Sequence, residues 1–238
     1  KLKNVTFEVI NAGIPGYTSY HTTTQFLTSL IDLKPDLVIS YQLFNELWYY
    51  FERNNEKMNS ENFQPFPSSS SIKIILDKSY FLTLIKVFIK KYSVRVNNSS
   101  IPNQEDSTNS IRTYDDKVLK YYLRNIKILA SFCKDQDISL ILSTPLSLYK
   151  ENNSEEEKNF IYDYFNKDFY LKLIKEGNEI LNNISKMYDD VYYFNLSNHI
   201  ECDLSTLKDR YHPTTLGNDL IGEEYKKFIF ENKLFEGN

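Results

Sequence analysis

The chain has 238 residues, a formal net charge of −4 and a hydrophobic fraction of 41%, values that fit a globular domain with a sizeable core. Lys and Arg form no concentrated basic stripe, which argues against nucleic-acid binding, and no apolar run reaches membrane-spanning length. The three histidines and the two cysteines, Cys133 and Cys202, show no ligand or redox spacing. We therefore expect no metal site and two buried free thiols.

The N-terminal part of the chain predicts a strand, a helix and a second strand. Alternating β-branched and aromatic residues indicate the first strand, and a short continuous apolar run indicates the second. Thr18 or Ser19 caps the helix, and Lys34-Pro35 ends it. The predicted ranges are a strand at 5–10, a turn at 11–16, a helix at 17–33 and a strand at 36–41.

The C-terminal part continues the alternation of strands and helices. The predicted ranges are a helix at 114–134, a strand at 138–142, a mostly helical stretch at 155–188 with Gly177 as a candidate break, a strand at 191–196 and a helix at 214–231. This alternation indicates an α/β sandwich with a mostly parallel sheet. In such folds, sites form where the strands end.

Residues 52–112 do not fit the alternation. Two polar, low-complexity pieces, at 53–71 and 97–110, flank an apolar helix candidate at 79–92. We interpret the region as an insertion in a single domain that spans residues 1–238. In one interpretation its helix packs on the domain body, and in the others it forms a substrate-facing lid or lies on a membrane surface.

Asp209 and His212, followed by Pro213, are the clearest candidate catalytic residues in the sequence. A carboxylate three residues before an imidazole can hold the ring in one tautomer, so that the ring acts as a general base. Pro213 suits the first position of the next helix, which would fix His212 just before that helix. A general base implies a nucleophile that it activates.

Three segments, in this order, resemble blocks of the SGNH (GDSL-type) hydrolase superfamily. The turn at 11–16 is similar to the second block of that family. The predicted strand from Lys34 to Ile39, followed by Phe44-Asn45-Glu46, is similar to the third block, and Asp209 to Pro213 is similar to the fifth. The matches cover nearly the whole chain and imply a flavodoxin-like, three-layer α/β/α sandwich.

The resemblance also implies roles for particular residues. His212 and Asp209 would be catalytic, and the Gly16 N–H and the Asn45 side-chain amide would form the oxyanion hole. The reaction would be hydrolysis of an ester through an acyl-enzyme, without a cofactor. Small-molecule, lipid or carbohydrate esters would be the substrates.

The chain departs from the family pattern in two ways. Glu46 stands where the family usually has Asp, and the first block, Gly-Asp-Ser after the first strand, is absent. No internal serine fits, because Ser19 lies in a helix start, Ser40 in a strand and Ser143 before Thr-Pro. We therefore expect an N-terminally truncated chain that lacks the first, central strand. The nucleophilic Ser would lie upstream of residue 1, and the chain alone would be inactive.

Each segment also has a simpler interpretation. The stretch from Asn11 to Gly16 alone reads as a tight turn, Asn45 as the cap of a helix that starts at Glu46, and the Asp209 motif as a capped helix start. The other two histidines read as a surface helix residue, His21, and as a loop residue, His199.

A second hypothesis belongs to a different class of function. It is a non-catalytic SGNH-like domain that binds a glycan or an acyl ligand. A third, a nucleotide-binding doubly wound domain, is disfavoured because the sequence has no glycine-rich phosphate loop.

Overall fold

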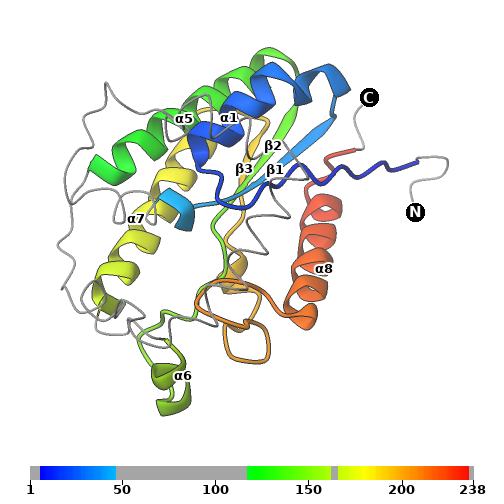
Figure 1. Ribbon diagram of the computed structural model, residues 1–238. Helices are drawn as coiled ribbons and strands as arrows, with labels where there is room; N and C mark the ends of the chain where they lie inside the picture. The colour runs from blue at the N-terminus through cyan, green and yellow to red at the C-terminus, as the bar shows by residue number, and fades with distance from the viewer. Residues whose placement is uncertain (1–5, 47–116, 162–165, 236–238) are drawn as a thin grey trace, which may run out of the picture. The chain divides into compact units, whose positions relative to one another are not determined.

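The computed structural model describes residues 6–46, 117–161 and 166–235, which belong to one compact unit of the chain (Figure 1). Its elements are α1 (Ser19–Thr28), the 3₁₀ helix η1 (Leu30–Leu33), β1 (Leu37–Tyr41), α5 (Lys117–Asp135), β2 (Ser139–Ser143), α6 (Glu155–Phe160), α7 (Lys167–Ser185), β3 (Val191–Tyr193), the 3₁₀ helix η5 (Leu196–Asn198) and α8 (Thr215–Glu231). The insertion expected at 52–112 lies outside the described residues and stays a prediction.

The three described strands form one parallel sheet in the order β1-β2-β3. Leu37 pairs with Ser139, and Leu140 pairs with Val191. The central strand, β2, is almost completely buried, as expected for a parallel strand that helices cover on both faces. The predicted alternation of parallel strands and helices is therefore confirmed.

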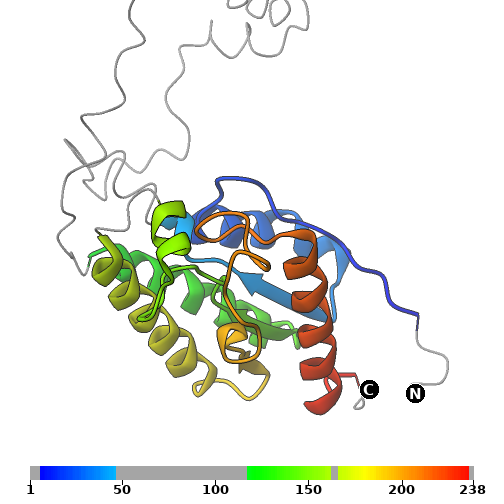
Figure 2. The same ribbon diagram turned by 90° about the horizontal axis from the view of Figure 1, so that it is seen from below.

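Helices cover both faces of this sheet (Figures 1 and 2). The helices α1, α5 and α7 lie on one face, where Phe26 of α1 contacts Phe132 of α5. The other face carries α8, whose Phe228 lies against Tyr192 and stacks on Phe194 at 4.3 Å between ring centroids. The expected three-layer α/β/α arrangement is thus confirmed in the described part of the chain.

The first predicted strand is not formed. Residues 6–10 have no regular secondary structure, and Phe7, Val9 and Ile10 expose about half or more of their surface. An extended segment becomes a strand only when its N–H and C=O groups pair with a neighbour, and no described strand pairs with residues 6–10. The prediction rested on residue pattern alone, which does not supply a partner.

Three smaller expectations can be compared with the structure. The helix predicted at 17–33 begins after Thr18, as expected, but it changes to a 3₁₀ turn at Leu30. Gly177 does not interrupt α7; it lies inside the helix, where a Cβ atom would meet Leu43 Cδ2 at 2.9 Å. Gly177 is therefore a site of close packing rather than a break. Both cysteines are free thiols; Cys133 is buried and Cys202 is half-buried.

His21 was expected on the helix surface, and this is wrong. Its ring is buried in the first turn of α1, where Nδ1 lies 2.8 Å from Thr18 Oγ1 and accepts the Thr18 N–H at 3.2 Å. His21 therefore takes the place that Glu or Gln usually holds in a capping box, and it closes the start of α1.

Candidate active site

Asp209 and His212 are joined directly in the loop that leads into α8. His212 Nδ1 lies 2.6 Å from Asp209 Oδ2, while Asp209 Oδ1 accepts the backbone N–H groups of Tyr211 and His212 at 3.0 and 2.9 Å. The carboxylate thus shapes an Asx turn and holds the imidazole at the same time. The interaction spans three residues, so the local sequence suffices to form it.

The environment keeps Asp209 ionised. Partial burial alone would raise the pKa of Asp209, but the hydrogen bonds from the two N–H groups and from the imidazole outweigh burial and lower it. An ionised carboxylate at Nδ1 favours the tautomer in which Nδ1 carries the proton and Nε2 is left as the base. More than half of the His212 side chain is exposed, and Nε2 has no hydrogen-bond partner among the described residues.

The loop that carries the pair is closed at its base. Leu207 and Pro213 form an antiparallel bridge, and the Lys208 N–H donates to the His212 carbonyl at 2.9 Å. Thr214 caps α8, because its Oγ1 accepts the Gly217 N–H at 3.0 Å. Pro213 therefore lies just before the N-cap residue of α8. The sequence predicts it at the first helical position, and this is wrong. His212 is fixed by the loop closure and not by the helix start.

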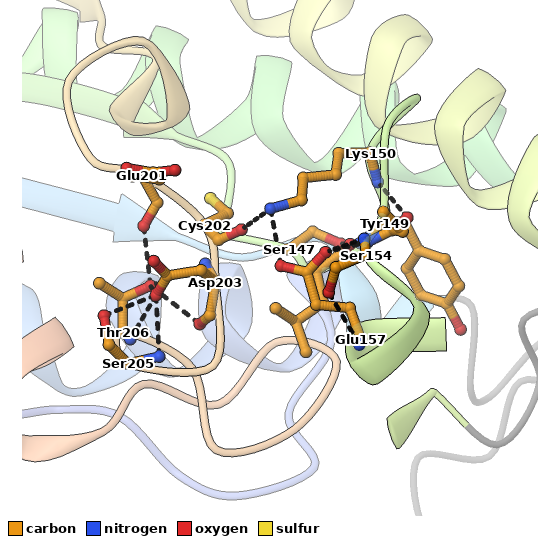
Figure 3. Close-up of polar contacts among 12 residues, drawn as sticks. Ser147, Tyr149, Lys150, Ser154, Glu157, Glu201, Cys202, Asp203, Ser205 and Thr206 are labelled. Carbon is orange, nitrogen blue, oxygen red and sulfur yellow. Dashed lines mark hydrogen bonds and ion pairs between the residues drawn. The ribbon is translucent and has the colours of Figure 1, made fainter. Parts of the chain in front are cut away.

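The loop rests on a second tight turn at residues 201–206 (Figure 3). Asp203 Oδ1 accepts hydrogen bonds from the Ser205 hydroxyl and N–H and from the Thr206 N–H, and the Ser205 hydroxyl is the main reason why the pKa of Asp203 is lowered. The Thr206 carbonyl accepts the Thr214 N–H at 2.9 Å. It also approaches Gly217 so closely that a Cβ atom there would lie 2.1 Å away. Glycine is therefore required where α8 meets this turn.

An ion pair between the half-buried Lys150 and the buried Glu157 supports the same turn (Figure 3). Lys150 Nζ donates to the Cys202 carbonyl at 2.8 Å and lies 2.7 Å from Glu157 Oε1. Glu157 is buried at the start of α6, where it forms a capping box with Ser154. The spacing Ser154-x-x-Glu157 is visible in the sequence, but the contact of Lys150 with Cys202 spans 52 residues and could not be inferred from it.

Gly16 lies in a turn between Ile14 and Tyr17, closed by a Tyr17 N–H to Ile14 carbonyl bond of 3.1 Å. Pro15 precedes it, and its own φ is +80°, as a type II turn requires at this position. A Cβ atom at Gly16 would meet nothing within 4 Å, so the backbone conformation and not a close approach demands glycine. The Gly16 N–H has no acceptor among the described residues.

Asn45 lies beside this turn. Its Nδ2 donates to the Tyr17 carbonyl at 2.8 Å, one residue from Gly16. The side chain therefore does not cap its own helical turn, which was the simpler interpretation. An amide carries two hydrogens, so one N–H of Asn45 remains after this bond.

Glu46, the residue after Asn45, also bonds to the segment at residues 17–19. Its Oε1 accepts the Ser19 N–H at 2.6 Å at the start of α1. Burial raises the pKa of Glu46 to about 7, although the hydrogen bonds with Ser19 act in the opposite direction. Asn45 and Glu46 together hold residues 17–19, a contact across 27 to 28 residues that the sequence alone does not reveal.

An aromatic stack connects the Asn45 segment to the Asp209 loop. Phe44 and Tyr211 stack with centroids 4.8 Å apart and planes inclined by 13°. The Tyr211 ring in turn lies 4.6 Å from the His212 ring. The structure therefore links Gly16, Asn45 and His212 through a continuous set of contacts.

The remaining candidate groups lie elsewhere. His199 pairs with Glu224 of α8 at 3.5 Å and contacts Phe194, so it is a loop residue with a partner of its own. Ser19, Ser40 and Ser143 are all buried. Among the described residues, no group of three or more His, Cys, Asp or Glu side chains is placed to hold a metal ion, and no helix there is long and apolar enough to cross a membrane.

Comparison with known proteins gives matches in structure but not in sequence. No protein-family model and no curated protein matches the chain. A candidate acylhydrolase from Bacteroides fragilis NCTC 9343 superposes with a TM-score of 0.50 at 16% identity, over 91% of this chain and 72% of its own. A GDSL-like lipase from Bacteroides thetaiotaomicron VPI-5482 gives a TM-score of 0.49 at 17% identity, over 91% and 73%.

At these identities the likeness concerns the fold and not the activity. The first match, at a TM-score of 0.50, covers 91% of this chain and therefore concerns the fold as a whole. The described part of the chain therefore shares an α/β fold with the matched acylhydrolase structure.

Proposed function

We propose that the protein is a serine-dependent ester hydrolase that works through an acyl-enzyme. The observation that carries the proposal is the 2.6 Å contact between Asp209 Oδ2 and His212 Nδ1, with the carboxylate ionised and Nε2 open to solvent. This is the arrangement of a general base with its orienting carboxylate. The hydrolase-like fold and the name of the first matched structure, an acylhydrolase, agree with it.

His212 moves the protons of the proposed reaction. Nε2 accepts the proton of the serine hydroxyl as its Oγ attacks the ester carbonyl carbon, and returns it to the leaving alkoxide when the tetrahedral intermediate collapses. A water molecule then attacks the acyl carbon while Nε2 takes a proton from it. The second tetrahedral intermediate collapses by breaking the bond to the serine Oγ, which takes that proton back from Nε2 as the carboxylic acid leaves. Asp209 stays ionised throughout and stabilises the imidazolium that forms in each step.

Gly16 and Asn45 are proposed to stabilise the negative oxygen of the tetrahedral intermediate. The Gly16 N–H has no acceptor among the described residues, and Asn45 keeps one amide hydrogen beyond its bond to Tyr17. Removing one such donor typically raises the barrier by about 3–4 kcal/mol. We expect Asn45→Ala to lower kcat accordingly.

The nucleophile is proposed to reside on a strand that pairs with the outer edge of β1. The Asp36 carbonyl and the Gln42 N–H both bond to β2, so by the alternation of a strand the backbone groups of Leu37, Ile39 and Tyr41 face the other way. Among the described strands nothing pairs with that edge, and 41% of the Ile39 surface is exposed. A parallel strand there would end on the same side of the sheet as the Asn45 segment.

The class of ester stays open within the proposal. Lipid esters, acetylated sugars and small acyl esters are all handled by one fold, because the fold does not select the substrate. The proposed partners are therefore small-molecule, lipid or carbohydrate esters.

Covalent labelling of the full-length gene product tests the proposal. A fluorophosphonate probe should label one serine, and hydrolysis of a panel of acetyl, butyryl and long-chain esters should accompany it. His212→Gln should abolish both signals, and His199→Gln, a histidine with its own partner, serves as the matched control. A folded protein that is neither labelled nor active would overturn the proposal. Binding of an acyl or glycan ligand by that protein would then identify the non-catalytic alternative.

A further inference from the structure

Tyr211 occupies an unusual place beside the proposed base. Adjacent side chains in an extended segment point to opposite sides, yet here the rings of Tyr211 and His212 lie 4.6 Å apart, inclined by 48°. The bend comes from Asp209, whose Oδ1 accepts the N–H groups of both residues. One carboxylate therefore brings the two rings into contact.

The bond to Asp209 does not by itself fix the imidazole. The single contact between His212 Nδ1 and Asp209 Oδ2 still allows the imidazole ring to tilt. Such tilting moves Nε2, the atom that is proposed to take the proton of the serine hydroxyl. More than half of the His212 side chain is exposed, so little else restrains it. In the described part of the chain, Tyr211 is the aromatic ring that contacts it.

Tyr211 is itself held on its other side. It stacks on the buried Phe44 at 4.8 Å and nearly parallel, and the Arg210 guanidinium carbon lies 5.4 Å from its ring centroid. The Arg210 carbonyl accepts the Leu148 N–H at 2.8 Å, which fixes the backbone just before it. The Tyr211 ring is thus restrained by contacts with Phe44 and Arg210 as well as with His212.

From these contacts we infer that Tyr211 is a positioning residue, which sets the orientation of the His212 ring and so the direction of Nε2. It also ties the base to the segment that carries Asn45, because Phe44 is the neighbour of Asn45 in the chain. This role rests on the proposed function, in which His212 is the base. The ring face is what matters, so the Tyr211 hydroxyl is dispensable.

The test is NMR of the imidazole groups in the full-length gene product. With three histidines in this sequence, the His212 and His199 signals are assigned by His212→Gln and His199→Gln. Tyr211→Phe should leave the Nδ1 proton of His212 unchanged. Tyr211→Leu should make its exchange with water roughly two- to tenfold faster, the range expected for loss of one ring contact, and should leave His199 unaffected.

Phe194→Leu provides the matched control, because it removes a buried ring 5.0 Å from His199. It should perturb the His199 signal and leave His212 unaffected. If Tyr211→Leu does not fold, Phe44→Leu loosens the same stack from its buried side and should shift the His212 signal in the same direction. An unchanged His212 signal in the folded variants, or equal perturbation by Phe194→Leu, would overturn the inference.

Ester hydrolysis gives an independent second readout. Tyr211→Leu should lower kcat with little change in KM, and Tyr211→Phe should retain the parent kcat. If the parent protein shows no hydrolysis at all, the proposed function fails while the NMR result still decides whether Tyr211 positions His212.

Discussion

Replacing Glu46 by Gln should stabilise the protein above pH 7. The Glu46 carboxyl is buried, and its Oε1 accepts the Ser19 N–H at 2.6 Å. The side chain of Gln keeps an acceptor at that position but cannot ionise. The substitution therefore mimics the protonated acid and removes the free energy needed to bury a charge.

The magnitude follows from the pKa. Burial raises the pKa of Glu46 from 4.5 to about 7, and each unit corresponds to 1.36 kcal/mol, so the free-energy difference is about 3 kcal/mol. Below pH 4.5 the folded and unfolded states are both protonated, and the contribution of Glu46 to stability is fully present. As the pH rises to about 7 the unfolded state loses its proton first, and that contribution is lost.

Urea unfolding of parent and variant at several pH values measures the effect. The free energy of unfolding of Glu46→Gln should exceed that of the parent by up to about 3 kcal/mol above pH 7, and the gap should close toward pH 4.5. Glu157→Gln is the matched control with opposite sign. Glu157 is also buried at a helix start, but hydrogen bonds, led by that from Lys150, overcome the effect of burial and lower its pKa.

The control variant should therefore be less stable than the parent at neutral pH, and that loss should fade in acid. If Glu46→Gln destabilises the protein equally at all pH values, the buried carboxylate stabilises the start of α1 by more than its burial costs, and the reasoning is wrong.

Three further pairs of substitutions test the structure around the site by urea unfolding. Gly217→Ala should destabilise the protein by about 2 kcal/mol or more, because its Cβ meets the Thr206 carbonyl, whereas Gly222→Ala in the same helix meets nothing within 4 Å and should stabilise by about 0.5–1 kcal/mol. Gly16→Ala should cost about 1–2 kcal/mol because of its positive φ, and Gly16→Asn should cost less. Lys150→Met leaves the buried Glu157 without its cation and should lower the free energy of unfolding by about 2–3 kcal/mol. The exposed pair of Lys134 and Asp190 is the control, and Lys134→Met should lower the free energy of unfolding by less than about 1 kcal/mol. Equal effects within any of these pairs would contradict the packing that each one tests.

Much of the fold was predictable from the sequence because its signals are local. The apolar runs of β1 and β2 and the cap at Thr18 each lie within a few residues, and the structure has them where the pattern placed them. The predicted strand at 5–10 failed for the opposite reason, because a strand needs a partner that no local pattern can supply. His21 failed similarly: its burial depends on what packs over α1.

In the candidate site, too, the contacts within one turn of chain were predictable from the sequence and the contacts between distant segments were not. The sequence by itself determined the contact of Asp209 with His212 and the turn at Gly16, because a carboxylate three residues before an imidazole and a Pro-Gly pair act within one turn of chain. Only the tertiary structure decided what surrounds them. Asn45 against Tyr17 and Phe44 against Tyr211 join residues distant in the chain, and such contacts form only when the folded domain brings together the segments after β1, before α1 and before α8.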